Sequence, residues 1–139
     1  MSFPFKQVLL VGATAGIGAA MADRLVYEGV KVIAVGRRQD RLDAFVHKHG
    51  SDKASAVQFD LSDSKNMDDF VSGVTQTYPD LDCVFLNAGI QSVVKLAEPE
   101  TVDLSAFHTE MSVNFSSFVD ITIKFLPFLK SKRSETGLI

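Results

Sequence analysis

The sequence predicts an α/β fold, a doubly wound parallel sheet with helices on both faces. Short apolar runs alternate with helix-like patterns along the 139 residues. Within each run the residues are continuously apolar, as in strands that are buried on both faces. A glycine-rich turn also separates the first run from the first helical pattern. Folds of this class bind their ligands at the carboxyl ends of the strands.

The first strand is predicted at Gln7–Val11, where an apolar run ends at Gly12. An amphipathic helix is predicted over Ile17–Glu28 and ends before Gly29, a common residue at helix C-termini. Its inward positions, one turn apart, are expected to be Ile17, Met21 and Leu25. A second buried strand is predicted at Lys31–Val35.

The middle of the chain repeats this pattern. We predict a helix over Asp40–Lys48 that ends at Gly50, and a strand over Ala54–Phe59. A further helix is predicted over Ser64–Thr77, stopped by Pro79. The residues expected to face the core from these two helices are Leu42, Phe45, Val46, Met67, Phe70, Val71 and Val74.

The last part of the chain contains one more strand and a long helix. Cys83–Leu86 is predicted as a fourth buried strand, and Leu104–Lys130 as one long helix. Gly137–Ile139 resembles the opening of a fifth strand. No linker divides the chain, so we expect a single domain over residues 1–139, truncated at the start of that fifth strand.

The composition is that of an ordinary globular protein, with 46% hydrophobic and 22% charged residues. A net charge of -3 gives no electrostatic reason to expect nucleic acid or an anionic membrane as a partner. The single cysteine cannot form an internal disulfide, and neither a signal peptide nor a membrane-length apolar segment is evident. We therefore expect a cytoplasmic protein.

The glycine-rich turn GATAGIG between the first strand and the first helix predicts a phosphate-binding site. A helix N-terminus supplies unpaired N–H donors and a positive dipole end, and both favour an anion. Gly12 would permit the tight turn, Gly16 the close approach of a phosphate, and Gly18 close packing of the helix on the strand. The residues between them that we assign to the same site are Thr14, Ala15 and Ile17. A merely structural turn is the alternative.

The end of the second strand predicts which nucleotide is bound. NAD sites usually place a carboxylate there for the ribose 2′-hydroxyl, but this strand runs into Arg37 and Arg38. A guanidinium can form charge-assisted hydrogen bonds to a 2′-phosphate, so NADP(H) is the predicted cofactor. Arg37 is the first choice for the phosphate, and Arg38 would support it or stack on the adenine. Alternatively, the two form a solvated pair, and Asp40 and Asp43 pair with Arg37 or Arg41.

These motifs resemble those of the short-chain dehydrogenase/reductase family, from about Gln7 to the last residue. The glycine turn matches the family's Thr-Gly-x3-Gly-Ile-Gly, with Val11 in place of the threonine. Three further matches follow in order: Asp60 with Leu61, Asn87-Ala88-Gly89, and Asn114. The resemblance implies a Rossmann-like sheet in which Asp60 contacts the adenine end of the cofactor and residues 87–89 border a ribose. It also implies that Asn114 belongs to the catalytic apparatus.

The resemblance further implies chemistry that these 139 residues do not contain. The family uses a serine after its fifth strand and a Tyr-x3-Lys pair on the next helix. The spacing does occur from Tyr27 to Lys31, but it spans a helix end and a strand, so the side chains would not share a helical face. We expect the chain alone to be inactive, as the NADP(H)-binding portion of an oxidoreductase that acts on a small carbonyl or alcohol.

A non-catalytic NADPH sensor or partner-binding module is the main alternative, and a scaffold that has lost the ligand is another. The phenylalanines of the long helix 104–130 are expected in a core or an interface. The resemblance implies that this helix often forms part of a subunit interface, so a homo-oligomer is expected. No metal site is predicted, because His47 and His49 lack a third ligand and should lie at a solvated helix end. Cys83 is expected to be buried and inert.

Overall fold

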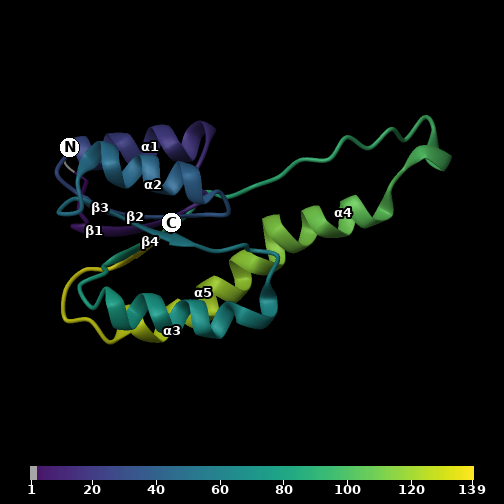
Figure 1. Ribbon diagram of the computed structural model, residues 1–139. Helices are drawn as coiled ribbons and strands as arrows, with labels where there is room; N and C mark the ends of the chain where they lie inside the picture. Colours follow the sequence, from purple (N-terminus) through teal and green to yellow (C-terminus); the bar gives the residue numbers. More distant parts are fainter. Residues whose placement is uncertain (1–2) are drawn as a thin grey trace.

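The computed structural model describes residues 3–139, which form one twisted parallel sheet with helices on both faces (Figure 1). The strands are β1 (Gln7–Val11), β2 (Lys31–Gly36), β3 (Ala54–Gln58), β4 (Cys83–Leu86) and β5 (Gly137–Leu138). The helices are α1 (Gly16–Tyr27), α2 (Gln39–His49), α3 (Met67–Thr77), α4 (Leu104–Met111) and α5 (Ser117–Lys130). Short 3-10 turns η1 (Ser64–Asn66) and η2 (Pro99–Thr101) and a π-helical segment η3 (Ser112–Ser116) complete the chain.

The sheet has the strand order β3-β2-β1-β4-β5, and every neighbouring pair is parallel. The chain therefore moves outward from β1 to β3 and then crosses back to β4 on the other side of β1. Val11 at the end of β1 is in register with Val35 of β2 and Leu86 of β4. The three strands thus end together at the point where the order reverses, which confirms the predicted doubly wound, Rossmann-like fold.

Two apolar cores lie on opposite faces of the sheet, because successive strand side chains point to opposite sides. Val8 and Leu10 pack in the cluster beneath α1 and α2, whereas Leu9 and Val11 pack in the cluster with α3 and α5. Figure 1 shows these two helix pairs on the two faces. The inward residues predicted for the helix over 64–77 are all buried: Met67, Phe70, Val71 and Val74.

The predicted inward position of Ile17 is wrong. Its side chain is 76% exposed, and α1 instead covers the sheet with Gly18, Ala22, Leu25 and Val26. The physical reason is the close contact at the start of the helix, where only a glycine fits between α1 and β1. Ile17, at the neighbouring position, lines a cleft at the carboxyl ends of the strands.

The helix predicted over Leu104–Lys130 is present but is not uniform. The chain stays helical through α4, η3 and α5, and the hydrogen-bonding pattern widens to a π-helical turn at Ser112–Ser116. Such segments accommodate an extra residue in a helix and occur often at functional sites. Asn114 lies in this segment.

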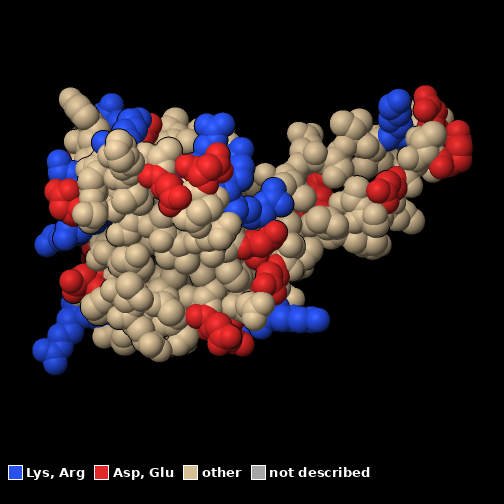
Figure 2. All heavy atoms as spheres, viewed as in Figure 1, with Lys and Arg blue, Asp and Glu red and all other residues tan. Residues whose placement is uncertain are grey.

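A long segment, residues 87–103, joins β4 to α4 and runs away from the sheet in Figure 1. Basic and acidic side chains are interspersed on the face of the molecule shown in Figure 2, so this face carries no extended region of one sign. Among residues 3–139, no helix combines the length and the apolar character that a membrane crossing requires.

Candidate functional site

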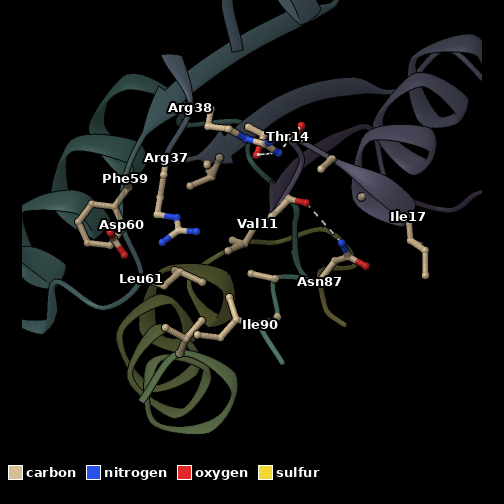
Figure 3. A pocket seen from close by; sticks show the side chains of 18 residues that line it. Val11, Thr14, Ile17, Arg37, Arg38, Phe59, Asp60, Leu61, Asn87 and Ile90 are labelled. Atoms are coloured by element: carbon tan, nitrogen blue, oxygen red, sulfur yellow. Dashed lines mark hydrogen bonds between the residues drawn. The ribbon is translucent and has the colours of Figure 1, made fainter. Parts of the chain in front are cut away.

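A cleft of about 460 Å³ lies at the carboxyl ends of β1, β2 and β4, where the strand order reverses (Figure 3). Most of the predicted nucleotide-binding residues line it: Gly12, Thr14, Ala15, Ile17, Gly18, Arg37, Arg38, Asp60, Leu61, Asn87, Ala88 and Gly89. Gly16 begins α1 beside the cleft without lining it, and Asn114 is connected to the cleft through Ile90. The fold thus assembles one site from five separate segments of the chain.

Six lining residues were not predicted: Val11, Val35, Gly36, Phe59, Ile90 and Val113. A signal for some of them was present. Val11, Val35 and Phe59 are the last residues of predicted strands, and parallel strands end at the same edge of the sheet. Ile90 directly follows Asn87-Ala88-Gly89, and Val113 precedes Asn114.

The glycine-rich turn has the backbone geometry that its glycines allow. Gly12 has φ +84° and Gly16 has φ +52°, a region that L side chains rarely adopt. The N–H groups of Gly12 and Ala13 both donate to the carbonyl of Val35, at 2.9 and 3.0 Å. A Cβ on Gly12 would stand 2.6 Å from Cα of Ala88, whereas the corresponding position on Gly16 is open. The turn is therefore packed on its inner side and free where α1 begins.

Gly18 and Asn87 join the turn to the end of β4. A Cβ on Gly18 would overlap the carbonyl oxygen of Gly12, and would stand 2.5 Å from Nδ2 of Asn87. That amide donates to the same Gly12 oxygen at 3.4 Å, and the Asn87 N–H donates to the Val11 carbonyl at 3.1 Å. Glycine at position 18 is what lets α1 approach β1 and β4 this closely.

Arg37 and Arg38 point in different directions. The guanidinium of Arg38 donates from Nη2 to the Thr14 carbonyl at 2.8 Å and to its hydroxyl at 3.3 Å. Arg37 extends into the cleft between Asp60 and Val11 (Figure 3). Within the part of the chain that the structure describes, Arg37 forms no ion pair within 4.0 Å, and the Asp40 carboxylate lies 3.8 Å from Arg41 instead. The guanidinium of Arg37 therefore faces the cleft with no described carboxylate in ion-pair contact, although its charge acts on Asp60.

Asp60 follows β3 and lies across the cleft from the glycine turn. Its Oδ1 accepts hydrogen bonds from the Ser62 N–H at 2.9 Å and the Ser62 hydroxyl at 2.8 Å. Burial alone would raise the pKa of Asp60, but these two donors and the charge of Arg37 outweigh it and hold the pKa below its ordinary value. Asp60 is thus ionised at neutral pH and fixes the bend that follows β3.

Asn114 binds the backbone of Ile90 with both ends of its carboxamide. Oδ1 accepts from the Ile90 N–H at 2.9 Å, and Nδ2 donates to the Ile90 carbonyl at 2.6 Å. The π-helical turn that contains Asn114 is thereby joined to the segment that follows β4, on the other side of β1 from Arg37. Since both polar atoms are engaged, the side chain acts here as a clamp on the cleft wall.

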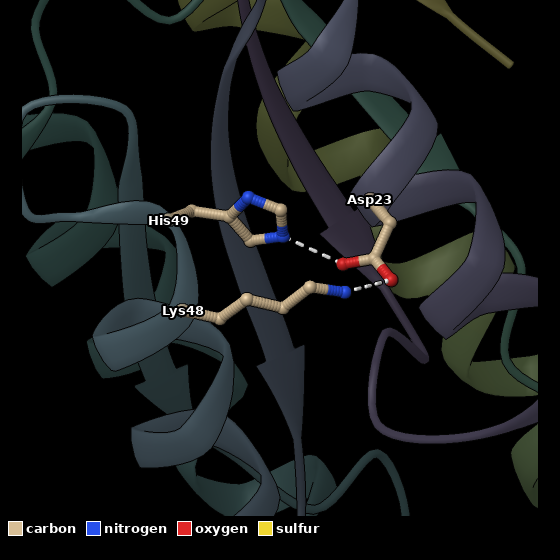
Figure 4. A network of polar contacts seen from close by, with 3 residues as sticks. All are labelled: Asp23, Lys48 and His49. Carbon is tan, nitrogen blue, oxygen red and sulfur yellow. Dashed lines mark hydrogen bonds and ion pairs between the residues drawn. The ribbon is translucent and has the colours of Figure 1, made fainter.

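A second polar cluster, drawn in Figure 4, contains none of the residues that line the cleft. Asp23 of α1 contacts Nζ of Lys48 at 2.7 Å and Nε2 of His49 at 2.6 Å, both at the end of α2. The predicted solvated end for His49 is therefore wrong, because its side chain is only 15% exposed and packs edge-on against Phe45. Among residues 3–139, no group of three His, Cys, Asp or Glu side chains could hold a metal ion.

Comparison with known proteins points to one family. A family model described as short chain dehydrogenase matches residues 6–139. Serine 3-dehydrogenase of Rhizobium radiobacter is 33% identical over 126 residues, which make up 91% of this chain and 49% of that protein. NADP-dependent 3-hydroxy acid dehydrogenase YdfG of Salmonella typhimurium is 32% identical over 120 residues, or 86% of this chain and 47% of that protein.

Solved structures of similar proteins agree in fold. A short-chain dehydrogenase from Streptomyces avermitilis superposes with a TM-score of 0.85 at 27% identity, over 99% of this chain and 49% of that one. A closed form of serine dehydrogenase complexed with NADP+ gives a TM-score of 0.83 at 26% identity, over 95% of this chain and 52% of that one. The chain spans about half the length of the curated relatives it matches.

Proposed function

The chain belongs to the short-chain dehydrogenase family, and we propose that it binds NADP(H) as the cofactor-binding part of an oxidoreductase. The observation that carries this proposal is the guanidinium of Arg37, which faces the cleft beside an open glycine turn and forms no ion pair within 4.0 Å among residues 3–139. The volume of about 460 Å³ lies within the range of ordinary ligand sites. Residues 1–139 would act as a single nucleotide-binding unit.

The residues of the cleft fit the parts of a dinucleotide phosphate. The turn at Gly12–Gly18 would hold the pyrophosphate, because Gly16 leaves open space at the N-terminus of α1. Arg37 would bind the 2′-phosphate, and Asp60 with Leu61 would border the adenine. The nicotinamide half would then lie beyond β4, beside Ala88, Gly89 and Ile90. This placement follows the strand order, since β2 and β4 flank β1.

The preference for NADP(H) over NAD(H) rests on charge. No carboxylate stands at the end of β2 to accept from a ribose 2′-hydroxyl, and the nearest candidate on α2, Asp40, contacts Arg41. Arg38 is held by Thr14, so it would shape the turn rather than bind the phosphate first. The NADP-dependent relative and the neighbour solved with NADP+ are consistent with this choice.

The proposed reaction class is hydride transfer between nicotinamide and a small carbonyl or alcohol. The bound cofactor would supply the hydride chemistry, and this chain's residues would bind and orient it. Asn114 is the one residue that we assign to the catalytic apparatus, and its clamp on Ile90 is the contact through which it would set the shape of the reaction site. The activity of a whole protein, and its substrate, are part of the proposal.

A non-catalytic NADPH-binding or partner-binding module is the second candidate. An exposed apolar stripe along α4 and α5 favours it, because exposed apolar surface of this kind marks interaction sites. The stripe consists of Leu104, Phe107, Met111, Phe115, Val119, Ile123 and Leu126. We propose that this helix, residues 104–130, supports a homo-oligomer. We also propose a cytoplasmic location, where the buried thiol of Cys83 would stay reduced.

Titration calorimetry with NADPH and NADH tests the proposal on the 139-residue chain. We expect NADPH to bind more tightly than NADH, with a preference of about 10-fold or more if one charge-assisted phosphate contact is formed. Equal affinity for the two cofactors would contradict the role of Arg37, and binding of neither would contradict the function. Turnover of small aldehydes and ketones with NADPH would separate the enzyme from the sensor only in a longer protein that includes this chain, because we expect the 139 residues alone to be inactive.

A further inference from the structure

Glu110 makes a contact that the proposed function does not use. Its Oε2 accepts a hydrogen bond from the Ser92 N–H at 2.6 Å. Glu110 precedes Asn114 by four residues on the continuous helix of α4 and η3, and Ser92 follows Ile90 by two residues on the segment after β4. The helix and the segment are therefore hydrogen-bonded at two successive points, Glu110 to Ser92 and Asn114 to Ile90.

The distance between the two contact points is nearly the same along the helix as along the segment. Residues four apart on a helix share a face and are separated by about 6 Å along its axis. Residues two apart on an extended chain point to the same side and are separated by about 6.6 Å. The segment runs antiparallel to the helix, since Ile90 meets the later helix residue and Ser92 the earlier one. The sequence spacing of Glu110 and Asn114 thus suits a two-point clamp.

Among the described residues, Ser92 is the last point before the helix cap at Asp103 at which this segment is hydrogen-bonded to the helix. Among the described residues, the polar contacts of residues 93–103 stay within that segment or reach only the first turns of α4. If the contact of Glu110 were lost, the loosely held stretch would extend back toward Ile90. Ile90 and Val113 both line the cleft, and the nearest atom to a Cβ on Gly89 would be Oδ1 of Asn114, at 3.7 Å.

We propose that Glu110 is a positioning residue for the end of the cofactor cleft beyond β4, acting through Ser92 and Ile90 rather than by touching a ligand. This inference rests on the proposed binding of NADP(H). Glu110 fixes the segment that forms the cleft wall, and Asn114 cannot hold that segment in place as firmly alone. The adenine end, at Arg37 and Asp60, is built from β2 and β3 and does not depend on Glu110.

The experiment compares Glu110→Ala and Glu110→Gln with the unaltered chain, using NADPH and adenosine 2′,5′-bisphosphate as ligands. The bisphosphate carries only the adenine half of the cofactor. We expect Glu110→Ala to raise the Kd for NADPH about fivefold to tenfold, as expected for part of one hydrogen bond to a charged acceptor. The Kd for the bisphosphate should not change. Glu110→Gln should restore NADPH affinity, because the amide oxygen can still accept from Ser92.

Hydrogen exchange supplies a readout that does not depend on a ligand. The amides of Ile90 and Ser92 should exchange faster in Glu110→Ala than in the unaltered chain, and Glu110→Gln should restore their protection. Glu100→Ala is the matched control, because Glu100 is an exposed glutamate on η2 of the same connection. It should change neither affinity nor exchange at Ile90.

The outcomes separate the inference from the function on which it rests. If the unaltered chain binds neither ligand, the proposed function fails, and a cofactor role for Glu110 fails with it. If both ligands bind and Glu110→Ala weakens both equally, or leaves NADPH affinity and Ile90 exchange unchanged, the positioning role alone is overturned. A selective loss of NADPH affinity that glutamine restores supports it.

Discussion

The guanidinium of Arg38 donates to the backbone carbonyl of Thr14 across 2.8 Å, and so ties the end of β2 to the glycine-rich turn after β1. A Cβ on Gly36 would collide with the Thr14 side chain, so the two segments are packed as well as hydrogen-bonded. Arg37, the preceding residue, points into the cleft. The two adjacent arginines are therefore expected to serve different purposes.

Replacement of Arg37 by alanine should weaken NADPH binding and leave NADH binding unchanged. The reason is that only NADPH carries the 2′-phosphate, and a hydrogen bond to a charged group contributes about 1.5–3 kcal/mol, equivalent to roughly 10- to 100-fold in Kd. Arg38→Ala should instead weaken the binding of both cofactors modestly and about equally, because it loosens the turn that both would use. Calorimetric Kd values for the two cofactors check this.

Arg41→Ala is the matched control for both arginine variants, since Arg41 lies one turn further along on α2 and does not line the cleft. It should leave both Kd values unchanged. A loss of NADPH affinity in Arg38→Ala but not in Arg37→Ala would reverse the two assignments.

Gly18→Ala should destabilise the fold, whereas Gly73→Ala should not. A methyl group on Gly18 would overlap the Gly12 carbonyl and the Asn87 amide, and such overpacking costs about 1–3 kcal/mol. Gly73 lies on α3 with nothing within 4 Å of the added Cβ, so alanine there should stabilise the helix by up to about 1 kcal/mol. Urea midpoints of the two variants should move in opposite directions. Equal midpoints would refute the close approach of α1 to β1.

Much of the fold was predictable because local signals sufficed. The apolar runs at Gln7–Val11 and Cys83–Leu86 are β1 and β4 with the same bounds, since buried strands leave continuous apolar stretches. The inward positions of α3 follow the helical period. Ile17 was misplaced because the same periodicity cannot detect that a glycine forms the contact surface of α1.

The rest of the site depends on contacts between distant residues. The sequence shows Arg38 and Thr14 but not that they meet 24 positions apart. The same is true of His49 with Asp23, and of Asn114 with Ile90. The spacing of apolar residues does not reveal a π-helical turn, so the sequence predicts one regular helix over residues 104–130. Residue types indicated the site's chemistry, whereas the tertiary fold decides which polar groups are engaged.

The contact between Asp23 and the end of α2 should add stability that disappears in acid. Burial would raise the pKa of Asp23, but the contacts with Lys48 and His49 outweigh it, so the pKa lies below its ordinary value of 3.8. A carboxylate whose pKa is lowered by folding contributes fully above its unfolded pKa and loses that contribution as the pH falls through its folded pKa. Asp23→Asn should therefore be less stable than the unaltered chain at neutral pH, by up to about 1 kcal/mol for a partly exposed pair.

Urea midpoints measured from neutral pH downward check this prediction. The difference in urea midpoint between Asp23→Asn and the unaltered chain should be constant above about pH 4 and should disappear below it. Asp43→Asn, whose carboxylate contacts only Gln39 among the described residues, should show a smaller gap. A gap that widens in acid would mean that Asp23 does not act as an ionised acceptor.

Cys83 should resist thiol reagents in the folded protein. It lies in β4 with no exposed surface, and burial, together with the nearby charge of Asp82, raises its pKa to about 12. Because the thiolate is the reactive form, labelling near pH 8 should be slow in buffer and fast in urea. Rapid labelling without denaturant would show that the edge of the sheet formed by β4 and β5 opens readily.

The helix over residues 104–130 should mediate self-association. Its exposed apolar side chains recur every three or four residues and form one stripe: Leu104, Phe107, Met111, Phe115, Val119, Ile123 and Leu126. Such a stripe favours burial against another surface, at about 25 cal/mol for each Å² of apolar area removed from water. We expect sedimentation velocity to show an oligomer whose fraction rises with protein concentration.

Ile123→Glu should shift this equilibrium toward the monomer, because Ile123 is 63% exposed in the stripe and a charge there would be desolvated on association. Lys130→Glu alters charge on the same helix outside the stripe and should have little effect. If the unaltered chain unfolds as a cooperative monomer with a Tm independent of concentration, α4 and α5 do not form a homo-oligomer interface in this chain. A concentration-dependent Tm that Ile123→Glu abolishes would instead locate the contact on this helix, since loss of an interface removes the mass-action stabilisation of the folded state.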